Sequence, residues 1–329
     1  MGTFVKIRMS TKSIKKAEPR MLETTLGEIR ALAENSAPII ADPPNIKLVT
    51  GPLPNPGSDP NFFDLTPNDD TVQLANGILG NTPGGLRALA GNDFVRGSGA
   101  AERMNGNSGL DTLIGGCGND SIRGGQDFDI LYGECGSDIL SGDLGNDYAY
   151  GGTENDFIRG GKGNDALVGE SGNDTLIGDV GIDRLWGSEG ADVFVLRREV
   201  GATSREIGST QPPPASNFNY ENFNYELVPA DFILDYNPGE GDVIGLASGL
   251  TRNDIVLSER FLTIGDARDY DSSGPVPPGT PQTREFRVLN TKATVIREAS
   301  TGNILGLVKD VSPDQLQFIS LSEGAIALG

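Results

Sequence analysis

The chain has 329 residues, a length that allows two or three domains, and its 46 acidic residues against 26 Lys and Arg give a net charge of −20. This charge argues against nucleic acid or an anionic membrane surface as a partner, because both require a basic face, and it favours cations. Histidine is absent, which excludes Ser-His-Asp and Cys-His catalysis and HExxH zinc sites. The 46 Gly and 20 Pro residues are typical of a turn-rich, all-β chain.

Residues 1–67 form a distinct N-terminal leader. Residues 24–35 (TTLGEIRALAEN) predict a short amphipathic helix, and seven prolines between Pro38 and Pro60 predict an extended linker. Two interpretations stay open for this leader, a flexible extension or a docking segment for a protein partner. The sequence predicts neither a secretory signal peptide nor a membrane span, because no apolar run reaches the required length.

The second predicted domain, residues 68–195, is dominated by a nine-residue repeat that is clear from residue 88 to residue 195. Examples are GGKGNDALV (160–168), GESGNDTLI (169–177) and GDVGIDRLW (178–186). Twelve repeats follow one another without an insertion; position one is Gly in eleven of them, position six is acidic in all, and position eight is apolar in all. Such coupled periodicity predicts a solenoid.

These repeats resemble the glycine-rich calcium nonapeptide GGxGxDxUx of RTX proteins, in which U is a large apolar residue. The resemblance covers about a third of the chain. It implies a right-handed parallel β-roll, several bound calcium ions and export by type I secretion with an uncleaved C-terminal signal. The stretches at 68–74 and 85–98 are similar to cyanobacterial members of the family.

The repeat can also be interpreted physically. The last three residues of each unit should form a short strand whose position-eight side chain points inward, and the first six should form a turn. Glycine suits that turn, which needs positive φ and close backbone approach. Two units make one coil of 18 residues. The predicted core is the position-eight series Val95, Met104, Leu113, Ile122, Leu131, Leu140, Ala149, Ile158, Leu167, Leu176, Leu185 and Phe194.

Stacked coils should place the position-six carboxylates in two ladders. One is Asp93, Asp111, Asp129, Asp147, Asp165 and Asp183; the other is Glu102, Asp120, Asp138, Asp156, Asp174 and Asp192. Two charges ~5 Å apart repel by about 0.8 kcal/mol in water and about 3 kcal/mol at a dielectric constant of 20. Calcium between neighbouring carboxylates would turn this repulsion into ligation, whereas magnesium should substitute poorly because it prefers a small octahedral shell.

The eleven aspartates are the predicted metal ligands. The two ladders hold at most about ten calcium ions, since six carboxylates leave five intervals in each ladder. We expect weaker sites near Glu102, whose side chain is longer, and where Ala100, Asp127 and Glu154 replace the position-four glycine. A roll that stacks on its apolar ladder without metal is the alternative.

Cys117 and Cys135 both occupy position three and are 18 residues apart, so they should lie on adjacent coils of one edge. That separation is compatible with a disulfide, and also with two free thiols. A disulfide would indicate an oxidising environment outside the cell.

Residues 196–329 lose the period and should form a β-rich region. The resemblance implies that this region caps the roll, can bind further calcium and carries the type I signal. The segment 211–224 predicts an insertion loop. Residues 230–246 resemble the segment that follows the roll in RTX proteins, although a β-hairpin turned by Asn237-Pro238-Gly239 is an alternative. Residues 293–297 and 304–308 predict two strands joined by a turn at Thr301-Gly302, and residues 311–316 predict a final turn or short helix.

The sequence therefore favours a non-enzymatic calcium-binding protein, extracellular or at the cell surface, that folds when it meets calcium. A structural or adhesive component of a surface layer or larger complex, docked through residues 1–67, is the alternative; it would also suit an intracellular complex. A carboxylate-based hydrolase with its pair in 196–329 is the third hypothesis.

Overall fold

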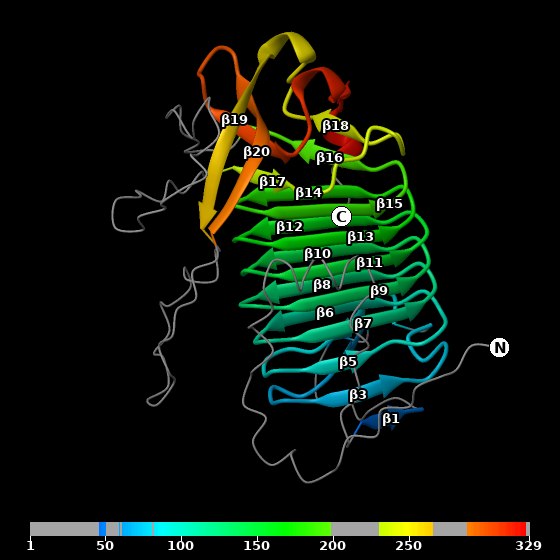
Figure 1. Ribbon diagram of the computed structural model, residues 1–329. Coiled ribbons are helices and arrows are strands. Elements are labelled where there is room, and N and C mark those ends of the chain that lie inside the picture. The colour runs from blue at the N-terminus through cyan, green and yellow to red at the C-terminus, as the bar shows by residue number, and fades with distance from the viewer. Residues whose placement is uncertain are drawn as a thin grey trace, which may run out of the picture.

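The computed structural model describes residues 46–50, 59, 61–80, 82–198, 230–265 and 288–326. Two sheets of parallel strands are stacked coil upon coil into an elongated body (Figure 1). From β1 to β18, odd-numbered strands belong to sheet A and even-numbered strands to sheet B, so the chain alternates between the sheets at every repeat. The predicted all-β parallel roll is confirmed.

The strands of sheet A are β1 (Lys47–Val49), β3 (Thr71–Leu74), β5 (Phe94–Arg96), β7 (Thr112–Cys117), β9 (Ile130–Cys135), β11 (Tyr148–Thr153), β13 (Ala166–Ser171), β15 (Arg184–Glu189), β17 (Asp231–Ile233), β21 (Ile304–Lys309), β20 (Val288–Glu298) and β19 (Ile255–Gly265). Those of sheet B are β2 (Phe62–Asp64), β4 (Gly85–Arg87), β6 (Arg103–Ser108), β8 (Ser121–Gln126), β10 (Ile139–Leu144), β12 (Phe157–Lys162), β14 (Thr175–Val180), β16 (Val193–Leu196), β18 (Val243–Leu246) and β22 (Phe318–Ser320).

The central strands are longer than the sequence predicts. Each spans six residues, positions seven to nine of one repeat and one to three of the next, because both halves pair in register with the neighbouring coil. In β10 and β12, Leu140 pairs with Ile158 and Asp143 pairs with Gly161. Position two takes a positive φ throughout, 73° at Glu134 for example, which bends the strand between its two halves.

The position-eight side chains form the central core, as predicted. Every one of them, from Val95 to Phe194, has an exposed fraction of 2% or less. Stacking these residues at the strand spacing buries a continuous apolar column, and at about 1.5–3 kcal/mol for a fully buried large side chain this column is the main favourable contribution to folding.

The roll begins before the clear repeats do. Strands β1 and β3 continue sheet A below β5, and β2 and β4 continue sheet B below β6. Strands β1 and β2 lie N-terminal to residue 68, where the sequence placed the start of the roll. The predicted helix at 24–35 and most of the proline-rich linker lie outside the described residues.

The C-terminal region closes the other end. Strands β17 and β18 extend both sheets by one coil each. The hairpin alternative at Asn237-Pro238-Gly239 is therefore wrong: the two strands flanking this turn belong to different sheets. Long antiparallel strands β19 and β20 and then β21 complete sheet A, and β22 completes sheet B; they form the top of the body in Figure 1.

The predicted strands at 293–297 and 304–308 are confirmed within β20 and β21. The predicted final turn is a 3-10 helix, η5 (Pro313–Gln315); a second one, η3 (Arg252–Asp254), precedes β19, and a short helix α2 (Glu323–Ile326) follows β22. The predicted loop at 211–224 lies outside the described residues. Among the described helices, none is long and apolar enough to cross a membrane.

Candidate calcium sites

The structure aligns the position-six acidic residues in the two predicted ladders. In each ladder, Oδ1 of an aspartate accepts the backbone N–H of the position-six residue one coil earlier, with N···O distances between 2.7 and 2.9 Å from Asp93 to Asp183 and from Glu102 to Asp192. Each aspartate is thus fixed by the coil below it. Because the ladder carboxylates from Asp93 to Asp192 all occupy position six of the repeat, they are spaced along the roll as the strands are.

The second carboxylate oxygen of each ladder aspartate is buried and has no hydrogen-bond partner. This holds for Oδ2 of all eleven predicted ligands: Asp93, Asp111, Asp120, Asp129, Asp138, Asp147, Asp156, Asp165, Asp174, Asp183 and Asp192. A buried charge without a partner costs several kcal/mol. A regular series of such oxygens therefore needs a compensating positive charge or protonation.

A small cradle beside the position-one glycine receives this orphaned oxygen. A Cβ at Gly160 would lie 2.7 Å from the carbonyl oxygen of Gly178, one coil on, and closer still to Oδ2 of Asp165. Gly160 does not have a positive φ, so glycine is needed here for space. The demand for positive φ falls on positions two and four instead. Carboxylate and carbonyl oxygens thus converge where a side chain would otherwise stand.

Burial makes the ladder carboxylates hard to ionise. It raises the pKa of Asp129 to about 8, and repulsion from Asp147 and Asp111 adds to this shift. Burial likewise raises the pKa of Asp156 to about 8, with Asp174 and Asp138 adding to it. The pKa of Asp165 is also raised, chiefly by burial and then by Asp183. A cation in the ladder would remove this penalty, because opposite charge favours the ionised form.

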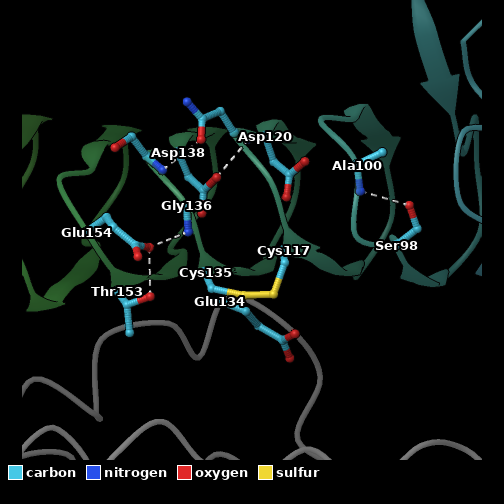
Figure 2. Close-up of a disulfide and its surroundings, with 12 residues drawn as sticks. Ser98, Ala100, Cys117, Asp120, Glu134, Cys135, Gly136, Asp138, Thr153 and Glu154 are labelled. Carbon is cyan, nitrogen blue, oxygen red and sulfur yellow. Dashed lines mark hydrogen bonds between the residues drawn. A yellow bond between two sulfur atoms is a disulfide. The ribbon is translucent and has the colours of Figure 1, made fainter.

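Glu102 differs from the aspartates as the sequence suggested. Its carboxylate accepts the N–H of Ser98 at 3.1 Å and the Ser98 hydroxyl, so it is satisfied within its own turn. Where Glu154 replaces the position-four glycine, its carboxylate adds hydrogen bonds to the turn. It accepts the N–H of Gly136 at 2.7 Å and the hydroxyl of Thr153 at 2.8 Å (Figure 2).

Cys117 and Cys135 form a disulfide between adjacent coils, so of the two open alternatives the structure has the bonded one. Their Cα atoms are 4.5 Å apart, and the residues pair directly across β7 and β9. Figure 2 shows the bridge on the same edge of the roll as Asp120 and Asp138. It therefore ties together two turns of the Glu102–Asp192 ladder.

The structure adds further rungs at the ends of the ladders; the resemblance indicated calcium binding after the roll but did not place these residues in the ladders. The N–H of Asp192 donates to Oδ1 of Asp242 at 2.9 Å, and that of Asp183 to Oδ1 of Asp231 at 3.4 Å. Asp231 begins β17, which ends at the inward-facing Ile233, and Asp242 directly precedes β18, which contains the inward-facing Ile244. This Asp-x-Ile spacing was the available signal. At the other end, the N–H of Asp70 donates to Oδ1 of Asp93 at 2.7 Å.

A column of asparagines at position five was missed as well. Each side-chain oxygen accepts the backbone N–H one coil on, as Asn146 does from Asn164 at 2.7 Å and Asn164 from Ile182 at 2.9 Å. The recurrent Asn-Asp pair of the repeats was the signal. These amides bond in the opposite direction to the aspartates, so each turn is held from above and below.

The oxygen set fits calcium. Ca²⁺ takes several hard oxygen ligands from carboxylates and backbone carbonyls. Within the described ranges, no three Asp, Glu or Cys side chains converge on one point. A bound ion would therefore draw on position-six carboxylates together with backbone carbonyls, and the cradle offers such a pair in Asp165 and the carbonyl of Gly178.

Comparison with known proteins agrees with this geometry. The RTX calcium-binding nonapeptide repeat matches the chain four times, over residues 86–113, 114–149, 141–176 and 168–197. No curated protein matches the chain. Residues 86–197 are thus RTX calcium-binding nonapeptide repeats, folded as a parallel β-roll.

Proposed function

We propose that this chain is a non-enzymatic calcium-binding protein whose roll folds when calcium occupies the two aspartate ladders. The observation that carries the proposal is the series of buried, unpartnered Oδ2 atoms, one in each of the eleven ladder aspartates. A single buried oxygen without a hydrogen-bond partner would be a local defect. Eleven in register indicate that the ionised ladders require positive charge along both edges.

The residues of the chain prepare these sites in two ways. Hydrogen bonds from the preceding coil orient each carboxylate, and the position-one glycine keeps the adjacent space free for the carbonyl oxygen of the next coil. Calcium supplies the charge that lets neighbouring carboxylates ionise together. Binding free energy then becomes folding free energy. Asp231 and Asp242 each add one candidate calcium site, between two ladder carboxylates, to those expected from the sequence. Glu102 weakens the site next to it, because its carboxylate is already bonded within its own turn.

We propose an extracellular or cell-surface location reached by type I secretion. Extracellular calcium modules bind at about 10⁻⁴–10⁻³ M, so a chain of this kind would stay unfolded where calcium is scarce and fold where it is abundant. The Cys117–Cys135 disulfide supports an oxidising destination. The likeness to cyanobacterial members rests on residues 68–74 and 85–98 and stays a prediction.

Circular dichroism during a calcium titration tests the proposal, with magnesium as the ion control. We expect a calcium-specific gain of β signal and little response to magnesium. Replacing Asp165 and Asp174 together by Asn should raise the calcium midpoint, because Asn keeps an acceptor for the neighbouring N–H but removes the charge.

The matched control is a pair of exposed acids outside the ladders, Glu189→Gln with Glu259→Gln, which makes the net charge less negative by the same amount. Its calcium midpoint should stay close to that of the unmodified chain. A roll that is fully formed in chelator, or a ladder variant that titrates like the control pair, would refute the assignment of the ligands.

A role as a structural or adhesive part of a larger assembly is compatible with the same calcium chemistry. The continuous sheets of the roll support it, because they make an elongated body with both ends closed by additional strands (Figure 1). Affinity capture with and without residues 1–45, a deletion that keeps the roll strands β1 and β2, distinguishes a component docked through the leader from a free protein. We propose no catalytic activity, and a hydrolase screen of the calcium-loaded chain tests that point.

A further inference from the structure

The outer face of sheet B carries a groove that the calcium ladders do not use. Its volume is about 590 Å³, and it runs across strands β6 to β14. The lining comes from positions nine, two and three of successive repeats, which point away from the position-eight core. The central lining residues are Arg123, Arg159, Lys162, Asp143, Asp179 and Leu144.

The residue types along this groove repeat every two coils. Arg87, Asn105, Arg123, Ser141 and Arg159 stand in one column, each in register with the next, so that arginine recurs every 36 residues. In the adjacent column glycine and aspartate alternate in the same way, because Gly125 and Gly161 flank Asp143 and Gly161 is followed by Asp179. The glycines have no side chain and so create the depth of the groove, and the aspartates line it.

The groove is cationic on a strongly anionic protein. Arg123, Arg159, Arg197 and Lys162 face two carboxylates, Asp143 and Asp179. Asp179 is buried and is shared by Arg159 and Arg197, so one carboxylate serves two guanidinium groups. Arg123 binds Asp143 at 3.0 Å, yet half of its side chain is exposed. The local surplus of positive charge remains open to a ligand.

Polar and apolar groups alternate along the same groove. Asn105, Gln126 and Ser141 contribute neutral donors and acceptors, and Leu144 and Val180 are each 44% exposed two coils apart. Exposed aliphatic side chains at regular intervals offer surfaces for the C–H faces of sugar rings. Neutral amides and hydroxyls pair with sugar hydroxyls, which a surface built for phosphate alone would not need.

We propose that this groove binds a linear acidic polysaccharide in which one carboxylate recurs in every disaccharide. The arginines are two coils apart, or ~9.6 Å at the strand spacing, and a disaccharide advances an extended chain by a similar length. Arg123 already binds Asp143 through Nε and Nη2, at 3.0 and 3.2 Å, so each ligand carboxylate would meet the exposed side of a guanidinium. The sugar between two carboxylates would lie over the exposed aliphatic side chain of the intervening coil.

The test is isothermal titration of the full calcium-loaded chain, its fold first verified by circular dichroism, with a hyaluronan hexasaccharide. Maltohexaose is the neutral control, and a thymidine hexanucleotide is the phosphate control. We expect measurable binding of the hyaluronan oligomer only, weakening as NaCl is raised. The double variant Arg123→Gln with Arg159→Gln should lose at least tenfold in affinity, and Lys162→Gln, which breaks no ion pair within the groove, should lose several-fold.

Arg103→Gln is the matched control, because Arg103 lies exposed on β6 but does not line the groove. Its affinity should stay within twofold of the unmodified chain. The proposal is overturned by undetectable binding at millimolar hyaluronan, by equal binding of maltohexaose or the hexanucleotide, or by an equal loss in Arg103→Gln. Because binding is measured on protein already shown to fold with calcium, its failure leaves the calcium proposal untouched.

Discussion

At the scale of single residues, glycine does two separate jobs in the repeat. At positions two and four it relieves the backbone, since residues there have positive φ, and Glu134 and Asp127 adopt it at 73° in its place. At position one it provides space, because a Cβ would meet the ladder carboxylate and the carbonyl of the next coil. This explains why position one tolerates almost no other residue, whereas position two accepts Asp, Glu, Asn and Ser.

Gly160→Ala tests the role of space. The backbone of Gly160 suits alanine, so the effect should come from the added methyl group pressing on Asp165 and Gly178. We expect a loss of about 1–3 kcal/mol in the free energy of unfolding at fixed calcium, as for other overpacked sites, together with a higher calcium midpoint. Urea unfolding at fixed calcium measures the first effect, and circular dichroism during a calcium titration measures the second.

Gly99→Ala is the matched control for this substitution, since nothing lies within 4 Å of its Cβ position and its φ is not positive. It should be neutral or slightly stabilising, because it lowers the entropy of the unfolded chain. Equal losses at both glycines would contradict the cradle.

At the scale of strands and their edges, the ladders should make metal-free folding sensitive to pH. Burial raises the pKa of Asp129 and Asp156 to about 8 in the folded state, above the ordinary aspartate value. The folded state therefore binds more protons than the unfolded state between these values. The stability of the metal-free roll is greatest at low pH and is lost as pH rises from about 4 to about 8.

The measurement is circular dichroism in chelator at pH 5.5 and pH 7.5. More β signal should appear at pH 5.5, where part of the ladder is neutral. With calcium in excess the order should reverse, because protons then compete with the metal for the same oxygens. A metal-free signal that is independent of pH would show that the ladder carboxylates are not buried together.

The disulfide between β7 and β9 should stabilise one edge of the roll. Cys117 and Cys135 are 18 residues apart, and closing a loop of about this length lowers the entropy of the unfolded chain by the equivalent of about 3 kcal/mol. Cys117→Ser with Cys135→Ser should lower the free energy of unfolding by up to that amount and raise the calcium midpoint. Unfolding of the variant and of the unmodified chain under oxidising conditions gives the comparison; identical curves would show that the bridge does not form in solution.

At the scale of the whole molecule, the sequence could predict the parts that repeat and not the ends. The core column from Val95 to Phe194 and the two ladders follow from period alone, because an inward side chain and a turn carboxylate recur in fixed positions. Strands β1 to β4 have no such period, since the paired core residues Phe63 and Leu86 are 23 residues apart, whereas Leu86 and its next partner Met104 are 18 apart. A local Asp-x-Ile pattern marks Asp231 and Asp242, but it could not align them with the ladders, because their strands pair with β15 and β16 across a long insertion.

The C-terminal region should be needed for the roll to fold as a soluble monomer. Without residues 230–326, strands β15 and β16 would become open edges, and Leu185 and Phe194 would lose the neighbours Ile233, Tyr236 and Ile244. Unpaired edges and an exposed end of the core favour association with other chains.

A variant that ends at Arg198 should therefore aggregate in calcium, or gain β signal only at a much higher calcium midpoint; size-exclusion chromatography and circular dichroism measure the two effects. The control ends at Ile326 and keeps every described element of the cap, so it should titrate like the full chain. A monomeric, normally titrating product of the shorter variant would mean that the repeats close their own end. The cap would then serve another purpose than completing the two sheets.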